Sequence, residues 1–227
     1  PSMFRSIKKN KIPLILLNAR ITQKTFNRWY KIKSVSNSIF KFIDAAYPQN
    51  LETKIFLKKL NVRHIKSIGN LKFIENDQHK YNKIDKNLFS QFKNHETFIA
   101  ASTHDKEELF AAKVHKILKK KKKNLITIII PRHINRVGQI INDIKSLDLN
   151  VITHSSKNKK LKDKDIYIVD TFGESKKFYK ISTSVFLGGS IVNKGGQNPL
   201  EPARFGAKIL HGPNVDNFKE VYKYLDN

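Results

Sequence analysis

The chain has 227 residues, of which 39% are hydrophobic and 10% aromatic, enough for one domain or parts of two around a real core. Apolar runs such as residues 12–17 and 125–130 recur between polar helical segments, which excludes disorder for most of the chain. No apolar stretch approaches the roughly 20 residues of a membrane-spanning helix. The sequence has no cysteine, which excludes disulfides and thiolate chemistry.

The chain is strongly basic, with 44 lysine and arginine residues against 19 aspartate and glutamate residues and a formal net charge of +25. Such a charge favours an anionic partner, either nucleic acid or a membrane surface. Most of the positive charge is lysine in a background rich in isoleucine and asparagine, so a drift in composition without a selected partner explains it equally well. No base-stacking aromatic cluster or nucleic-acid motif accompanies the lysines, so no nucleic-acid partner is expected.

The first part of the chain combines short strands with amphipathic helices. Strands are predicted at residues 11–17 and 64–68, and helices at residues 22–31, 36–46 and 51–60. The polar stretch from Gly69 to about Tyr81 is the candidate domain boundary.

From residue 85 onward the pattern becomes regular. Strands are predicted at residues 97–101, 125–130, 150–153, 166–169, 184–187 and 208–210, and helices at residues 85–92, 105–118, 135–146, 198–205 and from 217. This alternation predicts a parallel sheet covered by helices on both faces, with ligands beyond the carboxyl ends of the strands. The lysine run at residues 119–123 is interpreted as a solvated helix end.

Two of the polar clusters that follow predicted strands are explained by helix capping. Ser102 or Thr103 is a suitable N-cap for the next helix, which leaves His104 unexplained. Thr171 and Glu174 have the spacing of a capping box. The exposed amides of such a helix start also suit an anion or a ribose-bearing ligand.

A third cluster, Pro131-Arg132-His133 with Arg136, follows the most apolar predicted strand. On a helix, Arg132 and Arg136 would share a face and could bind one phosphate or carboxylate together. A pair of surface arginines is the competing interpretation.

The fourth cluster is the most unusual, because glycine pairs at residues 188–189 and 195–196 precede a strong helix start. Asn198 is suited to the N-cap, Pro199 to the first helical position and Glu201 to the third position after the cap. A helix cap does not require two glycine pairs. Glycines here would let the backbone approach a phosphate or a sugar. The Walker and dinucleotide fingerprints are both absent, as are metal-ligand spacings and a nucleophile elbow, which disfavours hydrolases and metalloenzymes.

Taken together, these clusters resemble the Kdo transferases, bacterial enzymes that add 3-deoxy-D-manno-octulosonic acid (Kdo) to lipid A precursors. The motifs match in order and spacing: LNAR at 17–20, GNLKF at 69–73, STH at 102–104, PRH at 131–133 with Arg136, DT at 170–171, GE at 173–174, GGS at 188–190, NPLEP at 198–202, GP at 212–213 and NF at 217–218.

The resemblance implies an α/β fold of the GT-B type, with a Rossmann-like parallel-sheet donor domain and the remnant of a second Rossmann-like domain. Residues 71–227 would form the CMP-sugar donor-binding domain, and residues 1–70 the C-terminal part of the acceptor domain. The implied donor-binding residues are Ser102, Thr103, Arg132, His133, Gly173, Glu174, Gly188, Gly189, Ser190, Asn198 and Glu201. Among these, Arg132 and His133 would meet the donor phosphate.

The implied reaction is transfer of Kdo from CMP-Kdo to the lipid A precursor lipid IVA in lipopolysaccharide biosynthesis. A CMP-sugar leaves with a single phosphate, which arginine and helix-start amides can neutralise, so no metal or other cofactor is expected. In the family the general base is expected upstream of Pro1, so these 227 residues are expected to bind the donor without turnover. Two alternatives remain open: another GT-B nucleotide-sugar transferase, and a non-catalytic nucleotide-sugar-binding remnant. A basic nucleic-acid-binding protein ranks third.

The lipid-bearing acceptor implies a location at the cytoplasmic face of the bacterial inner membrane, with peripheral attachment or an N-terminal anchor in the full-length protein. Attraction to anionic headgroups, at roughly 1 kcal/mol for each lysine near the surface, is expected from the first part of the chain. The lysines concerned include Lys8, Lys9, Lys11, Lys31 and Lys33.

Overall fold

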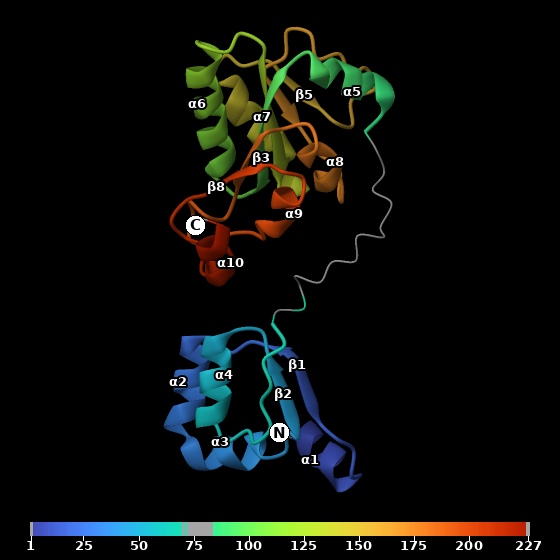
Figure 1. Ribbon diagram of the computed structural model, residues 1–227. Coiled ribbons are helices and arrows are strands. Elements are labelled where there is room, and N and C mark those ends of the chain that lie inside the picture. The colour runs from blue at the N-terminus through green and yellow to red at the C-terminus, as the bar shows by residue number, and fades with distance from the viewer. Residues whose placement is uncertain (1, 70, 72–83, 226–227) are drawn as a thin grey trace. The chain divides into compact units, whose positions relative to one another are not determined.

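The computed structural model describes residues 2–69, 71 and 84–225, and the chain divides into two compact units, Pro1–His79 and Lys80–Asn227 (Figure 1). Each unit has its own hydrophobic core. Most of the polar stretch expected to hold the domain boundary lies outside the described residues, so the boundary after residue 70 stays a prediction. No helix in the described ranges combines the length and the apolar character needed to cross a bilayer.

The first unit is built on a pair of parallel strands, β1 (Ile15–Ala19) and β2 (Ala45–Pro48). The helices of this unit are α1 (Ser2–Lys9), α2 (Gln23–Lys31), α3 (Lys33–Phe40) and α4 (Leu51–Lys59). Its core includes Phe26 of α2, whose ring stacks on Phe56 of α4 at a centroid distance of 4.3 Å.

Two predictions for the first unit are wrong. The helix expected over residues 36–46 ends at Phe40, because Ala45 and Ala46 pair with β1 in parallel register and so belong to β2. The strand expected at residues 64–68 is reduced to a single bridge between Ile65 and Ala46. Tertiary pairing with a neighbouring strand overrides local helix propensity here.

The second unit contains a six-stranded parallel sheet with the strand order β5-β6-β4-β3-β7-β8. Its strands are β3 (Glu96–Thr103), β4 (Leu125–Pro131), β5 (Val151–Thr153), β6 (Ile166–Ile168), β7 (Ser184–Leu187) and β8 (Lys208–Leu210). The chain leaves β3 towards β4 and later returns to the other side of β3 with β7, so the connections change direction beside β3.

Helices cover both faces of this sheet, as the alternating pattern predicts. The helical elements are α5 (Lys86–Lys93), α6 (Glu107–Lys119), the 3-10 helix η2 (Ile134–Arg136), α7 (Val137–Lys145), α8 (Ser175–Tyr179), α9 (Leu200–Ala203) and α10 (Lys219–Leu225). Successive residues of β4 contribute to different cores. Ile128 packs in the core that includes residues of α5, α8 and α10, whereas Ile129 packs in the core that includes residues of α6 and α7.

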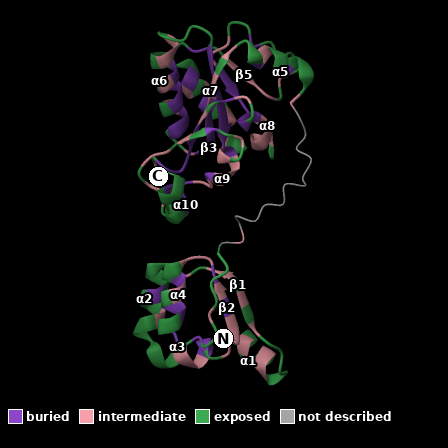
Figure 2. Cartoon of the chain, in the orientation of Figure 1, coloured by how far each residue is buried: buried purple, intermediate pink, exposed green. Residues whose placement is uncertain are grey.

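Burial is greatest along the central strands (Figure 2). Every residue of β4 is buried, as expected of a strand covered on both faces. The α/β class with a parallel sheet is confirmed, and the carboxyl ends of its central strands meet at one edge.

Candidate functional site

A hollow of about 260 Å³ opens at the carboxyl edge of the six-stranded sheet. It is formed where β3, β4 and β7 end, by the loop that follows β6, and by the turn that leads into α9. The lining residues are Ser102, Ile130, Pro131, Arg132, Ile134, Thr171, Phe172, Gly173, Glu174, Ser175, Tyr179, Leu187, Gln197, Asn198 and Glu201. Parallel α/β sheets bind their ligands at this edge. Arg132 and Asn198, which the sequence analysis assigns to one ligand site, therefore line the same hollow.

Ser102 reaches the hollow through an irregularity at the end of β3. Its φ of +54° is left-handed, and the register with β4 shifts between Ala101 and Thr103. Hydrogen bonds hold the residues on either side: the backbone N–H of Gly188 donates to the Ala101 carbonyl (2.8 Å), and that of Arg132 donates to the Thr103 carbonyl (2.9 Å). A bulge of this kind redirects a side chain at a sheet edge, at a cost of about 1–3 kcal/mol for the left-handed backbone.

Arg132 and Arg136 have different surroundings, so the prediction that they bind one anion together is wrong. Arg132 lines the hollow and makes no ion pair with another described residue. The guanidinium of Arg136 lies 3.1 Å from Oε1 of Glu108 and 2.7 Å from Oδ1 of Asp105. Burial raises the pKa of Glu108, and Arg136 partly offsets that rise. The two arginines do not share a helix, because η2 begins only at Ile134, after Arg132.

The loop after β6 contributes Thr171, Gly173 and Glu174 to the hollow. The predicted capping box is wrong, because α8 begins only after Glu174, which has helical dihedral angles and makes no side-chain cap. Gly173 has a φ of +80°, which favours glycine. Oγ1 of Thr171 is buried and has no hydrogen-bond partner among the described residues. Since buried hydroxyls are normally paired, it is available to a ligand.

Glu174 and Glu201 add two carboxylates to the lining. Glu174 forms an ion pair with Lys177 and lies 3.9 Å from Nε2 of His154. Glu201 lies 4.0 Å from the ammonium of Lys176. Each carboxylate is therefore partly compensated and remains a strong acceptor for a hydroxyl group.

The glycine-rich segment at residues 188–190 does not line the hollow, although Leu187 beside it does, so its role in donor binding stays a prediction. The segment is buried, and its amides bind the fully buried carboxylate of Glu107. Oε2 of Glu107 accepts from the N–H of Gly189 (2.7 Å), and Oε1 accepts from that of Ser190 (3.2 Å). Successive backbone amides form an anion-binding concavity, and here a side chain of the same chain occupies it.

Asn198 caps the start of α9 as predicted, with a small difference in position. Its Oδ1 accepts a hydrogen bond of 3.1 Å from the N–H of Leu200, while Pro199 occupies the N-cap position. The helix is shorter than the sequence pattern predicts and ends at Ala203. This turn presents Asn198 and Glu201 to the hollow.

Thr103 and His133, also predicted site residues, lie outside the lining. Thr103 is fully buried, whereas His133 is exposed and packs edge-on against His104 at 5.7 Å between ring centroids. Burial lowers the pKa of His104. Neither Ser102 nor Thr103 caps α6, because the chain passes through Lys106 in a left-handed conformation before the helix begins.

Sequence reasoning missed Phe172, Tyr179 and Gln197 as lining residues. Phe172 is 82% exposed, so its ring covers no core and is free to contact a ligand. An aromatic residue between Asp170 and Gly173 in a polar loop is a signal that could have identified it. Tyr179 is buried within α8, and nothing in the sequence separates it from ordinary core residues.

The hollow therefore combines one unpaired arginine, two partly compensated carboxylates, an unpartnered hydroxyl and an exposed aromatic ring. The guanidinium suits phosphate or carboxylate oxygens. The carboxylates and the hydroxyl suit sugar hydroxyl groups, and the ring suits the face of a base.

Comparison with known proteins identifies relatives of the whole chain. Residues 1–75 match the sequence profile of the family described as 3-Deoxy-D-manno-octulosonic-acid transferase (kdotransferase). A 3-deoxy-D-manno-octulosonic acid transferase of Rickettsia felis is 34% identical over 92% of this chain and 45% of its own length. The transferase of the same name from Haemophilus influenzae is 29% identical over 99% of this chain and 53% of its own length. The chain belongs to the Kdo transferase family.

Solved structures agree with this assignment. The C-terminal CMP-Kdo binding domain of WaaA from Acinetobacter baumannii has a TM-score of 0.56 and 26% identity, covering 61% of this chain and 75% of that one. Anabaena HepE in complex with UDP-glucose has a TM-score of 0.50 and 11% identity over 99% of this chain and 65% of that one, which shows the fold alone. The GT-B fold class expected from the sequence is confirmed. The chain spans about half the length of the curated relatives it matches.

Proposed function

We propose that the second unit of this Kdo transferase chain binds CMP-Kdo in the hollow at the carboxyl edge of its sheet, and that the protein transfers Kdo to a lipid A precursor of the lipid IVA type. The observation that carries the proposal is that Arg132 and the turn before Pro199 line the same hollow. The similarity to a solved CMP-Kdo binding domain supports it.

The charges of the hollow suit a nucleoside monophosphate better than a diphosphate. Arg132 is the one lining cation among the described residues, set against the carboxylates of Glu174 and Glu201. A single guanidinium can bind one phosphate in a bidentate manner. A second phosphate would add negative charge close to two carboxylates, which is unfavourable without a further cation.

In the proposed reaction, the bond between the anomeric carbon of Kdo and the phosphate oxygen breaks, and a hydroxyl of the acceptor attacks that carbon. Arg132 would stabilise the negative charge that develops on the departing CMP phosphate. Glu174, Glu201 and Thr171 would accept from or donate to hydroxyl groups and so fix the orientation of the donor. The acceptor hydroxyl must lose its proton to a general base, a role that the proposal assigns to none of these residues.

The acceptor and the location are part of the same proposal. A lipid-bearing acceptor requires access to a membrane surface, here the cytoplasmic face of the bacterial inner membrane in lipopolysaccharide biosynthesis. The first unit has exposed lysines, including Lys9, Lys11, Lys31 and Lys33, that would be attracted to anionic headgroups. We expect the chain to co-sediment with anionic vesicles and to remain in solution with neutral ones.

Calorimetric titration of the 227-residue chain with CMP and with UDP tests the donor site. CMP is expected to bind and UDP to bind at least about tenfold more weakly, because its second phosphate lacks a cation. Tighter binding of UDP would instead favour a GT-B transferase that uses a diphosphate-linked donor, and no binding of either nucleotide would contradict the proposal. The expectation that these residues bind the donor without transferring Kdo stays a prediction, and a transfer assay with CMP-Kdo and lipid IVA tests it.

A further inference from the structure

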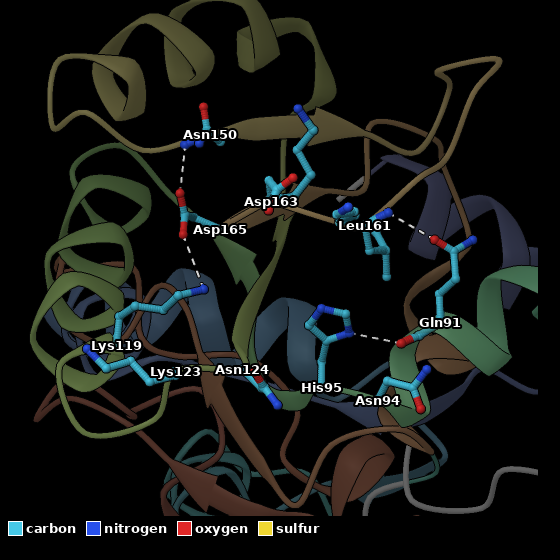
Figure 3. A pocket seen from close by; sticks show the side chains of 12 residues that line it. Gln91, Asn94, His95, Lys119, Lys123, Asn124, Asn150, Leu161, Asp163 and Asp165 are labelled. Carbon is cyan, nitrogen blue, oxygen red and sulfur yellow. Dashed lines mark hydrogen bonds and ion pairs between the residues drawn. The ribbon is translucent and has the colours of Figure 1, made fainter.

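A second and larger hollow, of about 610 Å³, lies at the opposite edge of the same sheet (Figure 3). Its lining includes residues just before four strands: His95 before β3, Asn124 before β4, Asn150 before β5 and Asp165 before β6. These positions mark the amino ends of the strands, whereas the hollow assigned to the donor lies at the carboxyl ends. The two hollows share no lining residue.

The hollow at the amino edge is rich in unpaired positive charge. Lys123, Lys162 and Lys164 line it and make no ion pair with any residue in the described ranges. Asp163 is the one carboxylate of the lining that is likewise unpaired within those ranges. Three ammonium groups therefore face one free carboxylate, and an anion would relieve their mutual repulsion.

The remaining charges of the lining are already compensated. The ammonium of Lys119 donates a hydrogen bond of 2.9 Å to the Leu125 carbonyl and lies 3.3 Å from Oδ1 of Asp165. The other oxygen of Asp165 accepts from the N–H of Asn150 at 2.9 Å, as Figure 3 shows. Asp165 is therefore committed to these partners, and Asp163 is the one carboxylate of the lining left to face the three lysines.

Hydrogen bonds hold the wall of this hollow in place. The N–H of Leu161, whose side chain is fully buried, donates to Oε1 of Gln91 at 2.9 Å. Nδ1 of His95 lies 2.9 Å from the carbonyl of Gln91 and so carries its proton when the ring is neutral. The loop that carries the lysines at 162 and 164 is thereby anchored to α5 (Figure 3).

Neutral hydrogen-bonding groups complete the lining. The side-chain amides of Asn94 and Asn124 have no hydrogen-bond partner among the described residues and can donate to an oxyanion. An adjoining hollow of about 500 Å³, which shares Gln91, adds Lys157, Lys159 and Lys160 to the same region. The sum of these charges raises the local concentration of anions around the hollow.

We propose that this hollow at the amino edge is an anion site for phosphate groups, distinct from the donor site and independent of the proposed function. Lys123, Lys162 and Lys164 bind the phosphate oxygens, and Asn94 and Asn124 donate hydrogen bonds to them. Asp163 lowers the affinity by repulsion. The phosphate can belong to a free small molecule or to a lipid headgroup, and the experiment separates these two sources.

The first arm uses pyrophosphate as the probe, titrated calorimetrically into the 227-residue chain at low salt. Binding is expected, and Lys123→Ala/Lys162→Ala/Lys164→Ala is expected to weaken it by about tenfold or more. The control Lys113→Ala/Lys208→Ala/Lys219→Ala removes the same charge from exposed sites elsewhere in the unit and should change affinity by less than about twofold. Asp163→Asn should strengthen binding.

The Arg132→Ala variant identifies which hollow binds the probe. It should retain pyrophosphate binding if the amino edge is the site. Loss of binding in Arg132→Ala with no loss in the triple variant would overturn the proposal. Equal weakening in the triple variant and its control would also overturn it, because a general positive field would then explain the binding.

The second arm uses vesicles of phosphatidylcholine with and without phosphatidylglycerol. The site is assigned to a lipid headgroup if three results agree. The triple variant loses vesicle binding, its control retains it, and pyrophosphate displaces the chain from the vesicles. Pyrophosphate binding without that pattern assigns it to a free phosphate compound. If neither probe binds in a manner that depends on the three lysines, the proposal is wrong.

Discussion

The carboxylate of Glu107 accepts a hydrogen bond of 2.7 Å from the backbone N–H of Gly189, which joins the first turn of α6 to the end of β7. The same carboxylate accepts from the N–H groups of His104, Ser190 and Ile191. One buried side chain thus fixes the loops that follow β3 and β7. Since Ser102 and Leu187 at these strand ends line the hollow, the shape of the proposed donor site depends on Glu107.

The Glu107→Gln variant tests this dependence. Glutamine keeps the shape but places an amide N–H₂ against backbone donors, so we expect the free energy of unfolding to fall by about 1–3 kcal/mol. Urea denaturation followed by circular dichroism measures the change. Glu220→Gln, at an exposed position of α10, is the control and should change stability by less than about 0.5 kcal/mol. Equal stability of the two variants would show that the amides find other partners.

Gly188 lies too close to β3 to accept any side chain. A Cβ at this position would lie 2.4 Å from the Ser102 carbonyl oxygen and 2.6 Å from the Cα of Thr103. Gly188→Ala should therefore destabilise the second unit by about 1–3 kcal/mol or more. Gly138→Ala is the matched control, because a Cβ there meets nothing within 4 Å and helix propensity predicts a gain of about 0.5–1 kcal/mol. Thermal unfolding of both variants should show shifts of opposite sign.

We expect the loss of Arg132 to affect CMP binding and the loss of Arg136 to affect stability. Arg132→Ala should weaken CMP binding by about tenfold to a hundredfold, because a charge-assisted hydrogen bond contributes about 1.5–3 kcal/mol. Arg136→Ala should leave CMP affinity within about twofold and reduce stability, because it leaves the buried carboxylate of Glu108 without its partner. Calorimetry and urea denaturation give the two readouts. A larger loss of CMP affinity in the Arg136 variant would contradict this division.

Phe172 is expected to contribute to binding and not to folding. Because 82% of it is exposed, Phe172→Ala should change stability by less than about 0.5 kcal/mol. If its ring stacks on the cytosine base, CMP affinity should fall by about 1–3 kcal/mol, whereas Phe172→Tyr should bind as the parent chain does. Alanine and tyrosine variants with the same CMP affinity would exclude stacking.

Acid is expected to destabilise the second unit through one buried and two partly buried histidines. Burial lowers the pKa of His104, His115 and His154 from the ordinary value of 6.5. The unfolded chain therefore takes up protons at a higher pH than the folded chain, and stability falls as pH drops below about 6.5 towards the lower folded-state values. His115 is fully buried, with Nδ1 2.9 Å from the Thr127 hydroxyl.

Removal of one such histidine should flatten this pH dependence. Urea denaturation of His115→Gln between about pH 7.5 and pH 5.5 should show a smaller loss of stability than the parent chain. His133→Gln replaces an exposed ring and should keep most of the parent slope. An unchanged slope for His115→Gln would show that other groups determine the acid sensitivity.

The sequence by itself determined the class of fold and the edge at which the site lies. Buried strands such as β4 show as apolar runs, and the polar residues that follow them must meet at one edge when the strands are parallel. This reasoning brought Arg132 and Asn198 to one hollow without knowledge of any distance. The order of the motifs also determined the family, because motifs that lie far apart in the chain all match the same family in order and spacing.

Only the tertiary structure decided which polar groups are free to bind a ligand. Arg132 and Arg136 are equivalent in sequence, yet Glu108 of α6 and Asp105 in the turn before α6 neutralise Arg136. The amides of Gly189 and Ser190 donate to the carboxylate of Glu107, more than 80 positions away in the chain. Ala45 and Ala46 follow a helical pattern but pair with β1. In each case the partner comes from a distant segment, and local spacing carries no information about which distant group will satisfy a charge, a donor or a strand edge.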